Sequence, residues 1–403
     1  MSTSLLYHTQ GIKNFQHLSF EYEGKYLIWN IVRKANKFKC STCLSTKVKV
    51  VSYHKRGIRG LPMGSKILII RVKMHRIICS NCGANLVEVL PFLPFSKCHY
   101  TKKVATCALE LREEMTISAV AVHLQLHWCT VKEIEKTHLQ KKYKKIDLKG
   151  IESIGIDEVY IGKKHKFLTI VRDLLSGRVL FVGEGKSSDC LAPFTQKLKC
   201  AKAKLKFLAI DLGNAYSSWI KKDFPDCEIV YDHFHLIKLM NDKLTDVRRK
   251  TMNKLEDDER KVLKGKRFTL AKNIENLDAK ERSDLDEIRS TFSDLGEMSM
   301  MKECLRNIYS IAEDVDEAKI AFKRWCELAI ETGIKELKTM AKTITQRLDG
   351  IIAFWKTGFT SASMEGFNNK IGWLQRQAYG YRDLEYFKLK IYDLPKLKTI
   401  KDL

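Results

Sequence analysis

The hydrophobic pattern of this chain changes period twice, and each change predicts a different kind of folded unit. Up to about residue 100 the apolar residues form short strand-like runs, such as 48–53 and 67–72, joined by a turn with glycine and proline. From Thr101 they recur at helical spacing, in one helix through 104–115 and then in two shorter segments. The three-residue turn Gln125–His127 between these segments predicts a helix-turn-helix, although other small helical bundles show the same spacing.

From residue 150 the pattern is that of an α/β domain. The strand run Ile151–Tyr160 is followed by 166–173 and 178–184, which predict an antiparallel meander. Two more strands, 205–210 and 228–231, then alternate with helices. This is the order of a ribonuclease-H-like sheet, in which the first and fourth strands lie side by side.

A long helical insertion interrupts this domain. Residues 236–345 are charged and helical in pattern, with no proline and almost no strand signal. The sheet domain is expected to resume at 351–355 and to close with a helix within 361–381, whose apolar positions fall on one face.

Composition and charge narrow the class of protein. The chain has 403 residues, of which 44% are hydrophobic, so it is too apolar to be disordered. No apolar run reaches the roughly 18 residues of a membrane span, and the start MSTSLLYHTQ lacks the features of a signal peptide. These features predict a soluble intracellular protein.

The net charge of +24 is unevenly distributed. Residues 1–150 contain 26 Lys and Arg against 9 Asp and Glu, so this third carries +17 of the total. Clustered cations gain affinity by displacing counterions from phosphates, and the pattern therefore indicates DNA or RNA rather than a membrane surface. The alternative is that the basic excess only aids solubility.

Two pairs of cysteines have the spacing of a zinc site. Cys40-x-x-Cys43 and Cys79-x-x-Cys82 are separated by 35 residues, and two such knuckles can form the tetrahedral four-thiolate shell of structural zinc. One structural Zn²⁺ ion is predicted here, the alternative being four ordinary buried thiols.

The chemistry of the α/β domain centres on acidic residues at its strand ends. Asp157 follows an apolar strand, and burying a carboxylate without a partner costs free energy. Such an acid is therefore expected to face a cation or a cleft. The alternative is that it lies in an acidic turn exposed to solvent. The predicted strand order brings Asp157 next to Asp211. Glu365 begins the last amphipathic helix, and a capping role is weakened because Ala362, three residues earlier, cannot cap. Carboxylates in this arrangement suit two Mg²⁺ or Mn²⁺ ions in phosphodiester chemistry.

Basic residues around the helix-turn-helix are candidates for contacting nucleic acid. The second short helix carries one polar and two basic candidates, and a basic linker follows it: Thr130, Lys132 and Lys136, then Lys141, Lys142, Lys144 and Lys145. In the insertion, Arg324 and Trp325 could stack on a flipped base, although a single tryptophan in a helix commonly belongs to the core.

Several long motifs together resemble the DDE transposases of bacterial insertion sequences, specifically the ISL-three family. They are IDEVYIGKKHKFLTIVRD, FLAIDLGNAY, FPDCEIVYDHFHLIKLMNDKLTDVRR and SMEGFNNKIGWLQRQAYGYRD, with HKRGIRGLPMG and the paired cysteines in the first half. The resemblance implies Asp157, Asp211 and Glu365 as the metal-binding catalytic triad, with 53 and 153 residues in the two gaps.

The same resemblance implies further roles and partners. Asp232 and His235 match an Asp-x-x-His signature that supports the site, and Asn369 and Arg376 match a helix pattern that touches DNA or the scissile phosphate. The implied activity is binding of the terminal repeats in double-stranded DNA, end cleavage and strand transfer, by a homodimer or larger assembly in the bacterial cytoplasm at the nucleoid. The alternatives are a DNA-binding regulator on an inactivated transposase scaffold and a structure-selective nuclease.

The prediction as a whole is a multidomain protein. It comprises a β-rich four-cysteine zinc module at 1–100, a helix-turn-helix DNA-binding domain at 101–149, and a ribonuclease-H-like α/β catalytic domain at 150–403 with an all-helical insertion at about 236–345.

Overall fold

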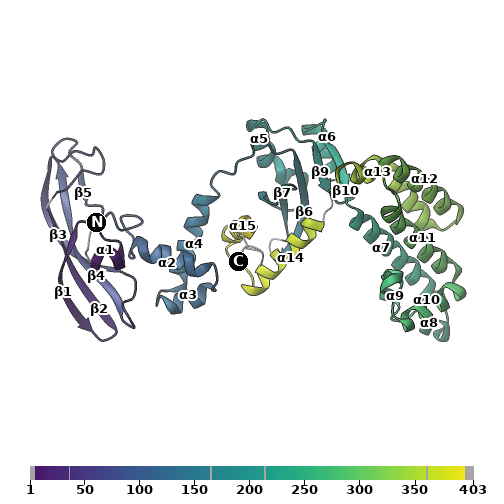
Figure 1. Cartoon of the computed structure of the whole chain (residues 1–403), viewed down its shortest axis with the longest axis horizontal. Helices are drawn as coiled ribbons and strands as arrows, with labels where there is room; N and C mark the ends of the chain where they lie inside the picture. Colours follow the sequence, from purple (N-terminus) through teal and green to yellow (C-terminus); the bar gives the residue numbers. More distant parts are fainter. Residues whose placement is uncertain (1–4, 36, 164–165, 213–214, 360–361, 395–403) are drawn as a thin grey trace. The chain divides into compact units, whose positions relative to one another are not determined.

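The structure is a computed structural model that describes residues 5–35, 37–163, 166–212, 215–359 and 362–394. The chain divides into two compact units, Met1–Lys144 and Lys145–Leu403. It is a mixed α/β protein with one sheet in each unit (Figure 1). None of the described helices is both long and apolar enough to cross a membrane.

The first unit consists of a mixed sheet followed by three helices. Its elements are α1 (Leu5–Gln10), β1 (Phe15–Glu23), β2 (Tyr26–Arg33), β3 (Val48–Arg59), β4 (Ile67–Cys79), β5 (Asn85–Val87), α2 (Lys102–Arg112), α3 (Ile117–His123) and α4 (Trp128–Lys142). The strand order is β1-β2-β4-β3, with β5 paired to β4. The strands β2 and β4 are parallel, and the other neighbouring strands are antiparallel. The predicted hairpin of β3 and β4 is confirmed, whereas α1 is a helix in a segment whose pattern indicated strands.

The helices α2, α3 and α4 of this unit each begin at a residue whose side chain caps the first turn. Thr101 and Thr116 accept hydrogen bonds from the backbone N–H groups of Val104 and Ala119, which starts α2 and α3. Gln125 has a positive φ of 49° in the turn before α4. A small core that includes Ala108, Val120 and Val131 joins the helices.

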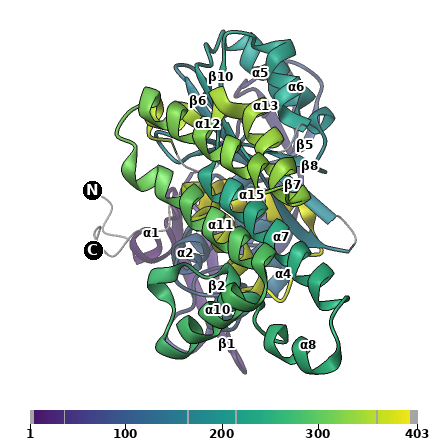
Figure 2. The same cartoon turned by 90° about the vertical axis from the view of Figure 1, so that its right-hand side faces the viewer.

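The second unit contains the other sheet and many helices. Its elements are β6 (Ser153–Gly162), β7 (Lys166–Asp173), β8 (Val179–Glu184), η1 (Ser188–Leu191), α5 (Ala192–Cys200), β9 (Phe207–Ile210), α6 (Ala215–Asp223), β10 (Glu228–Tyr231), α7 (His233–Met252), α8 (Asp257–Leu263), α9 (Arg267–Ala271), η2 (Ile274–Asn276), α10 (Ala279–Thr291), α11 (Ser293–Ile311), α12 (Val315–Glu331), α13 (Lys335–Thr357), α14 (Ala362–Gln377) and α15 (Leu384–Asp393). Figure 2 shows helices α7 and α10 to α13 toward the viewer.

The strand order of the second sheet is β10-β9-β6-β7-β8. The strands β6, β7 and β8 are antiparallel, while β9 is parallel to both β6 and β10. The prediction that the first and fourth strands of this domain are neighbours is therefore confirmed.

The two faces of this sheet are covered by different helices. Because side chains alternate along a strand, Ile154 and Ile156 face a core shared with α5 and α6, whereas Val159 faces a core shared with α14 and α15. In Figure 1 the latter two helices are the yellow ones beside the strands. The sheet thus has a covered face on each side, and α14 lies on the face that carries Asp157.

Two predictions about boundaries differ from the structure. The strand β6 continues to Gly162, so Asp157 and Glu158 lie within the strand and not at its end. Residues 351–355 belong to the long helix α13 rather than starting a new element, because Ile351 and Ile352 continue its buried helical stripe. The two apolar patterns are hard to distinguish over five residues.

A glycine allows α13 to approach the sheet closely. A Cβ atom on Gly350 would lie 2.6 Å from Cδ2 of Tyr231 and 3.1 Å from the carbonyl oxygen of Ile229. We expect Gly350→Ala to destabilise the second unit by about 1–3 kcal/mol, since α13 would have to move away from β10. Scanning calorimetry would measure the change in Tm.

Gly366 provides the matched control for that substitution. It also lies inside a helix, but a Cβ atom there would meet nothing within 4 Å. Gly366→Ala is expected to leave Tm unchanged or to raise it, because alanine favours a helix by up to about 1 kcal/mol relative to glycine. Equal effects of the two substitutions would contradict the packing argument.

Candidate active site and metal centre

The register of the parallel strands places acidic residues in a row across the sheet. Strand β6 pairs with β9 so that Gly155 is opposite Ala209, and two residues further this register sets Asp157 opposite Asp211. Strand β10 pairs with β9 so that Tyr231 is opposite Ile210, and the backbone N–H of Asp232 donates to the Ile210 carbonyl oxygen at 3.3 Å, which places Asp232 next to the end of β9 that Asp211 follows. The acids therefore converge although they are far apart in the sequence.

Asp157 is held by two hydrogen bonds. The backbone N–H of Glu158 donates to its Oδ1 at 2.7 Å, and Nδ2 of Asn368 on α14 donates to its Oδ2 at 2.6 Å. Burial raises the pKa of Asp157, and the nearby carboxylate of Asp211 acts in the same direction. A desolvated carboxylate next to a second one is an environment that a bound cation would relieve.

Glycine and methionine bring α14 against this strand. Gly155 lies two residues before Asp157, and a Cβ atom there would be only 3.1 Å from Sδ of Met364. Met364 and Phe367 are buried, and the Arg172 guanidinium lies over the Phe367 ring at 4.2 Å from its centroid. These contacts fix the helix that carries Asn368.

Glu365 lies one turn before Asn368 on α14 and is exposed to solvent. Among the described residues, Asp157, Asp211 and Glu365 do not form a group whose ligand atoms are all mutually close, as the cysteines below do. The structure thus brings Asp157 and Asp211 together and places the helix of Glu365 beside them. Asn368 has a buried Oδ1 that finds no hydrogen-bond partner among the described residues, which adds an oxygen acceptor next to Asp157.

Asp232 and His235 form a pair at the start of α7. The Asp232 side chain is fully buried, and its Oδ2 lies 3.0 Å from Nδ1 of His235. This contact raises the pKa of His235, and the charges of Asp211 and Asp157 contribute in the same direction. His235 is therefore within the electrostatic reach of the acids and is oriented by Asp232.

Asn368 is the site residue that the sequence analysis missed. Asn369 was predicted to touch DNA or phosphate, and it is exposed on α14, as is Arg376. Asn368 is turned toward the sheet. The available signal was its spacing, because residues 365 and 368 lie on neighbouring positions of one helix face.

The four cysteines form a compact cluster in the first unit. Their sulfur atoms all lie within 4.8 Å of one another, with Cys40 Sγ 3.6 Å from Cys82 Sγ and Cys43 Sγ 3.5 Å from Cys79 Sγ. Four thiolates at about 2.3 Å from a tetrahedral Zn²⁺ ion are about 3.8 Å apart, so the cluster fits zinc.

The backbone around the cluster favours thiolates. The N–H groups of Cys43 and Thr42 lower the pKa of the Cys40 thiol to about 6. In both knuckles the residue after the second cysteine has a positive φ, 61° at Leu44 and 70° at Gly83. The two halves of the site therefore share one turn geometry, which is suited to holding a metal ion between two knuckles.

The basic candidates of the first unit lie on α4 and in the segment that follows it. Lys132 and Lys136 are half-buried, whereas Lys141, Lys144 and Lys145 are exposed. Lys142 lies over the Tyr143 ring at 5.0 Å from its centroid. Thr130 is in the first turn of α4, whose N-cap is His127.

In the insertion, the expectation that a single tryptophan in a helix belongs to the core is confirmed for Trp325, and base stacking by this residue is excluded. Trp325 is buried in the helical core, and its Nε1 donates to the Met301 carbonyl oxygen at 2.9 Å. The neighbouring Arg324 pairs with Glu327 at 3.1 Å.

Comparison with known proteins agrees with this architecture. The model of the DDE transposase family of ISL3 type, described as a transposase, matches residues 154–391, which run from β6 to α15. This chain belongs to that transposase family. The Bordetella parapertussis transposase for insertion sequence element IS1001 is 32% identical over 356 residues, covering 87% of each chain.

Less similar proteins that match this chain are also transposases. The Mycobacterium tuberculosis transposase for insertion sequence element IS1557 is 25% identical over 382 residues, covering 87% of this transposase and 84% of the relative. Among solved structures, the Drosophila P element transposase strand transfer complex matches with a TM-score of 0.39 and 11% identity over 74% of this chain and 92% of that one. That overlap is too low for an argument about geometry.

Proposed function

We propose that this transposase binds the terminal repeats of its insertion sequence, cleaves the element ends and joins the freed 3′-hydroxyl groups to target DNA. The observation that carries the proposal is the register that sets Asp157 opposite Asp211, with α14 fixed against Asp157 through Asn368. The strand order and the two covered faces support a ribonuclease-H-like catalytic domain at 150–403, interrupted by the helical insertion.

Asp157, Asp211 and Glu365 are proposed to hold two Mg²⁺ or Mn²⁺ ions. Their oxygen donors suit hard cations, and the buried Asn368 Oδ1 and the desolvated Asp157 carboxylate support a cation next to β6. When bound, such ions activate the attacking oxygen and stabilise the leaving one.

The other residues of the site are proposed to position groups. Asn368 fixes the carboxylate of Asp157, so that its oxygens keep one orientation when DNA enters. Asp232 holds His235, whose raised pKa favours the cationic imidazolium beside the substrate phosphates. Asn369 and Arg376, exposed on α14, are proposed to contact DNA near the scissile phosphate.

DNA binding is assigned to the first unit, as a β-rich zinc module at 1–100 and a helix-turn-helix domain at 101–149. Thr130, Lys132 and Lys136 would lie along the DNA groove, and the lysines at 141, 142, 144 and 145 would contact the backbone. Since two element ends must be handled together, the active species is proposed to be a homodimer or larger assembly at the nucleoid.

The direct test uses the full chain and duplex DNA taken from the ends of the element. Incubation with Mg²⁺ should cut at the element boundary, and a denaturing gel would map the products. A metal chelator should abolish the cut. Sequence-specific binding without cleavage, with either Mg²⁺ or Mn²⁺, would instead identify a DNA-binding regulator on this scaffold.

Asn368→Ala is expected to lower the rate of end cleavage about 10- to 100-fold, as loss of a residue that orients a metal ligand typically does. Asn368→Asp should lower the cleavage rate further than Asn368→Ala, because it places a second negative charge at hydrogen-bond distance from Asp157. The cleavage rate should be measured across a series of Mn²⁺ concentrations, since a positioning residue shifts the metal dependence.

Gln377→Ala is the control for that experiment, because Gln377 is exposed at the end of the same helix. It should cleave at the wild-type rate. A wild-type rate and metal dependence for Asn368→Ala would show that the contact with Asp157 is not needed.

A further inference from the structure

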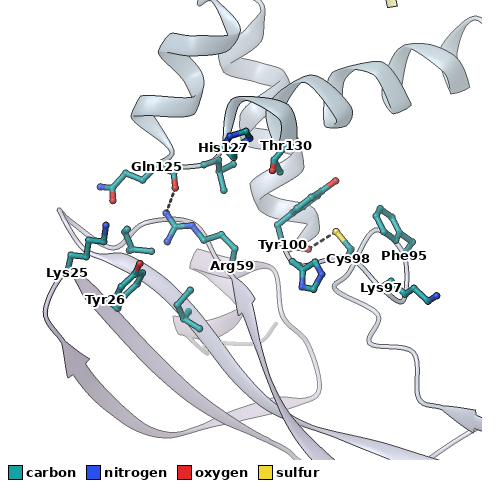
Figure 3. Close-up of a pocket in the computed structure, with 14 residues that line it drawn as sticks. Lys25, Tyr26, Arg59, Phe95, Lys97, Cys98, Tyr100, Gln125, His127 and Thr130 are labelled. Carbon is teal, nitrogen blue, oxygen red and sulfur yellow. Dashed lines mark hydrogen bonds between the residues drawn. The ribbon is translucent and has the colours of Figure 1, made fainter. Parts of the chain in front are cut away.

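A cavity of about 660 Å³ lies in the first unit, between the sheet and the turn that precedes α4 (Figure 3). Its walls come from the starts of β2 and β4, the end of β3, residues 95–100, the turn at 125–127 and Thr130. The volume is in the range of small-ligand sites. None of the DNA-contact residues assigned above lines it except Thr130.

The lining of the cavity is cationic. Lys25, Arg59 and Lys97 line it together with His99 and His127, and the described lining residues include no aspartate or glutamate. The cavity also opens at the first turn of α4, where the backbone N–H groups carry the positive end of the helix dipole. An anion is therefore the ligand that these walls favour.

Aromatic rings share the same walls. Tyr26, Phe95 and Tyr100 line the cavity, and 55% of Phe95 is exposed to solvent. Lys25 Nζ lies 5.5 Å from the centroid of the Tyr26 ring. Exposed rings next to lysines are the combination with which proteins bind single-stranded nucleic acid, since bases stack on the rings and phosphates meet the cations.

Arg59 ties two elements of the first unit together at the wall of the cavity. Its Nη2 donates to the carbonyl oxygen of Leu124 at 2.9 Å, which ties β3 to the end of α3. Its Nη1 is buried and makes no hydrogen bond to the described residues. The guanidinium group lines the cavity, where its positive charge attracts an anionic ligand such as a phosphate.

We propose that this cavity binds an unpaired nucleotide of the DNA on which the transposase acts. A base pair within a duplex keeps its base stacked inside, whereas a recessed site with both rings and cations fits a nucleotide that has left the stack. Because the cavity adjoins the first turn of α4, the nucleotide would lie next to the duplex that this helix contacts. The inference rests on the proposed DNA-binding function of the first unit.

The test compares the full chain bound to two duplexes of the terminal repeat, one blunt and one with a short single-stranded thymidine overhang. Fluorescence anisotropy at one fixed salt concentration gives both Kd values, and we expect tighter binding of the overhang. Replacing its thymidines by abasic residues should remove most of the gain, because the rings then have no base to stack on. Equal Kd values for the blunt and overhang duplexes would overturn the proposal.

Phe95→Ala and Lys97→Ala are the informative variants, since both side chains are exposed and neither should alter folding. Loss of stacking at Phe95 should reduce the overhang preference about five- to hundredfold, judged from typical base–aromatic contacts. The blunt duplex should bind as in wild type. If both variants keep the full preference for the overhang duplex, the unpaired nucleotide does not bind in this cavity and the proposal is wrong.

Val89→Ala and Lys49→Ala are the matched controls. Both are exposed in the same unit and neither lines the cavity. They should retain the overhang preference of the wild type.

Two other outcomes separate this inference from the function on which it rests. Saturable binding of free thymidine monophosphate, tighter than that of the overhang, would make the cavity a site for free nucleotides and overturn its assignment to DNA. Mg²⁺-dependent end cleavage without any overhang preference would overturn the cavity proposal alone. Failure to bind either duplex would overturn both.

Discussion

Asp157→Asn should lower the rate of end cleavage by more than about a hundredfold. This residue is proposed to bind metal directly, and loss of residues that only orient such ligands already costs 10- to 100-fold. The asparagine keeps the shape of the side chain, and its single oxygen can accept one of the two hydrogen bonds that Asp157 receives from Glu158 and Asn368. Cleavage of terminal-repeat DNA in Mg²⁺, with single-turnover kinetics, measures the effect.

The same substitution should not reduce the stability of the metal-free protein. The pKa of Asp157 is raised in the folded state, so the ionised carboxylate opposes folding at neutral pH. Its contribution to stability is greatest when the group is protonated, and it is lost as the pH rises through the raised folded pKa. A neutral asparagine removes that cost, and Tm is expected to stay the same or to rise.

Glu152→Gln is the control for charge removal on the same segment. Glu152 immediately precedes β6, is partly exposed and pairs with Lys206 at 2.7 Å. We expect its cleavage rate to equal that of wild type. If Asp157→Asn cleaved at the same rate as this control, the assignment of Asp157 to catalysis would be wrong.

Cys79→Ser should remove the metal from the first unit and abolish DNA binding. Structural zinc contributes about 10–16 kcal/mol of binding free energy in small zinc-finger peptides, which rivals the net stability of about 5–15 kcal/mol of a whole domain. Metal analysis should find one Zn²⁺ per wild-type chain and none in the variant. A strong chelator should have the same effect as the substitution.

The structure indicates which part of the unit depends most on this metal. Most of the first half of β3 is exposed, including Val51 and Tyr53, whereas the core around Trp29, Leu68 and Ile70 does not include the four clustered cysteines. Hydrogen exchange should therefore accelerate first in the knuckles and in the part of the β3–β4 hairpin that adjoins them. Slow exchange should persist longer at Leu68 and Ile70.

Cys200→Ser is the matched control, because Cys200 is an exposed free thiol in the other unit. It should keep one Zn²⁺ per chain and wild-type DNA affinity. A wild-type protein without bound zinc, or a Cys79→Ser variant with unchanged exchange and affinity, would contradict the structural role of the cluster.

Features that depend on residues close together in the sequence could be predicted from the sequence of this protein. The spacing of Cys40, Cys43, Cys79 and Cys82 predicted a cluster that the structure confirms. The period of apolar residues predicted the helices α2, α3 and α4 and the strands of the second unit, because each element is short and its pattern depends only on neighbouring positions. The family was likewise identified from motifs.

Contacts between segments that are distant in the sequence could not be predicted as well. Apolar residues at 351–355 could not be distinguished from a strand until the helix α13 was seen to continue through them. The burial of Trp325 was expected from the sequence, but its hydrogen-bond partner, the Met301 carbonyl oxygen on α11, was not. The contact between Asn368 and Asp157 depends on how α14 lies on the sheet, which in turn requires the missing side chain at Gly155.

The sequence by itself determined the candidate residues for the chemistry: the cysteine pairs, the acids and the basic segment, since residue type and short spacing are local properties. Tertiary structure alone decided that Asn368 holds Asp157, that Asp232 is buried against His235, and that cations and rings from four separate segments line one cavity. The reason is that strand register and helix packing are set by side chains from opposite parts of the chain, whose shapes become complementary only when those parts meet.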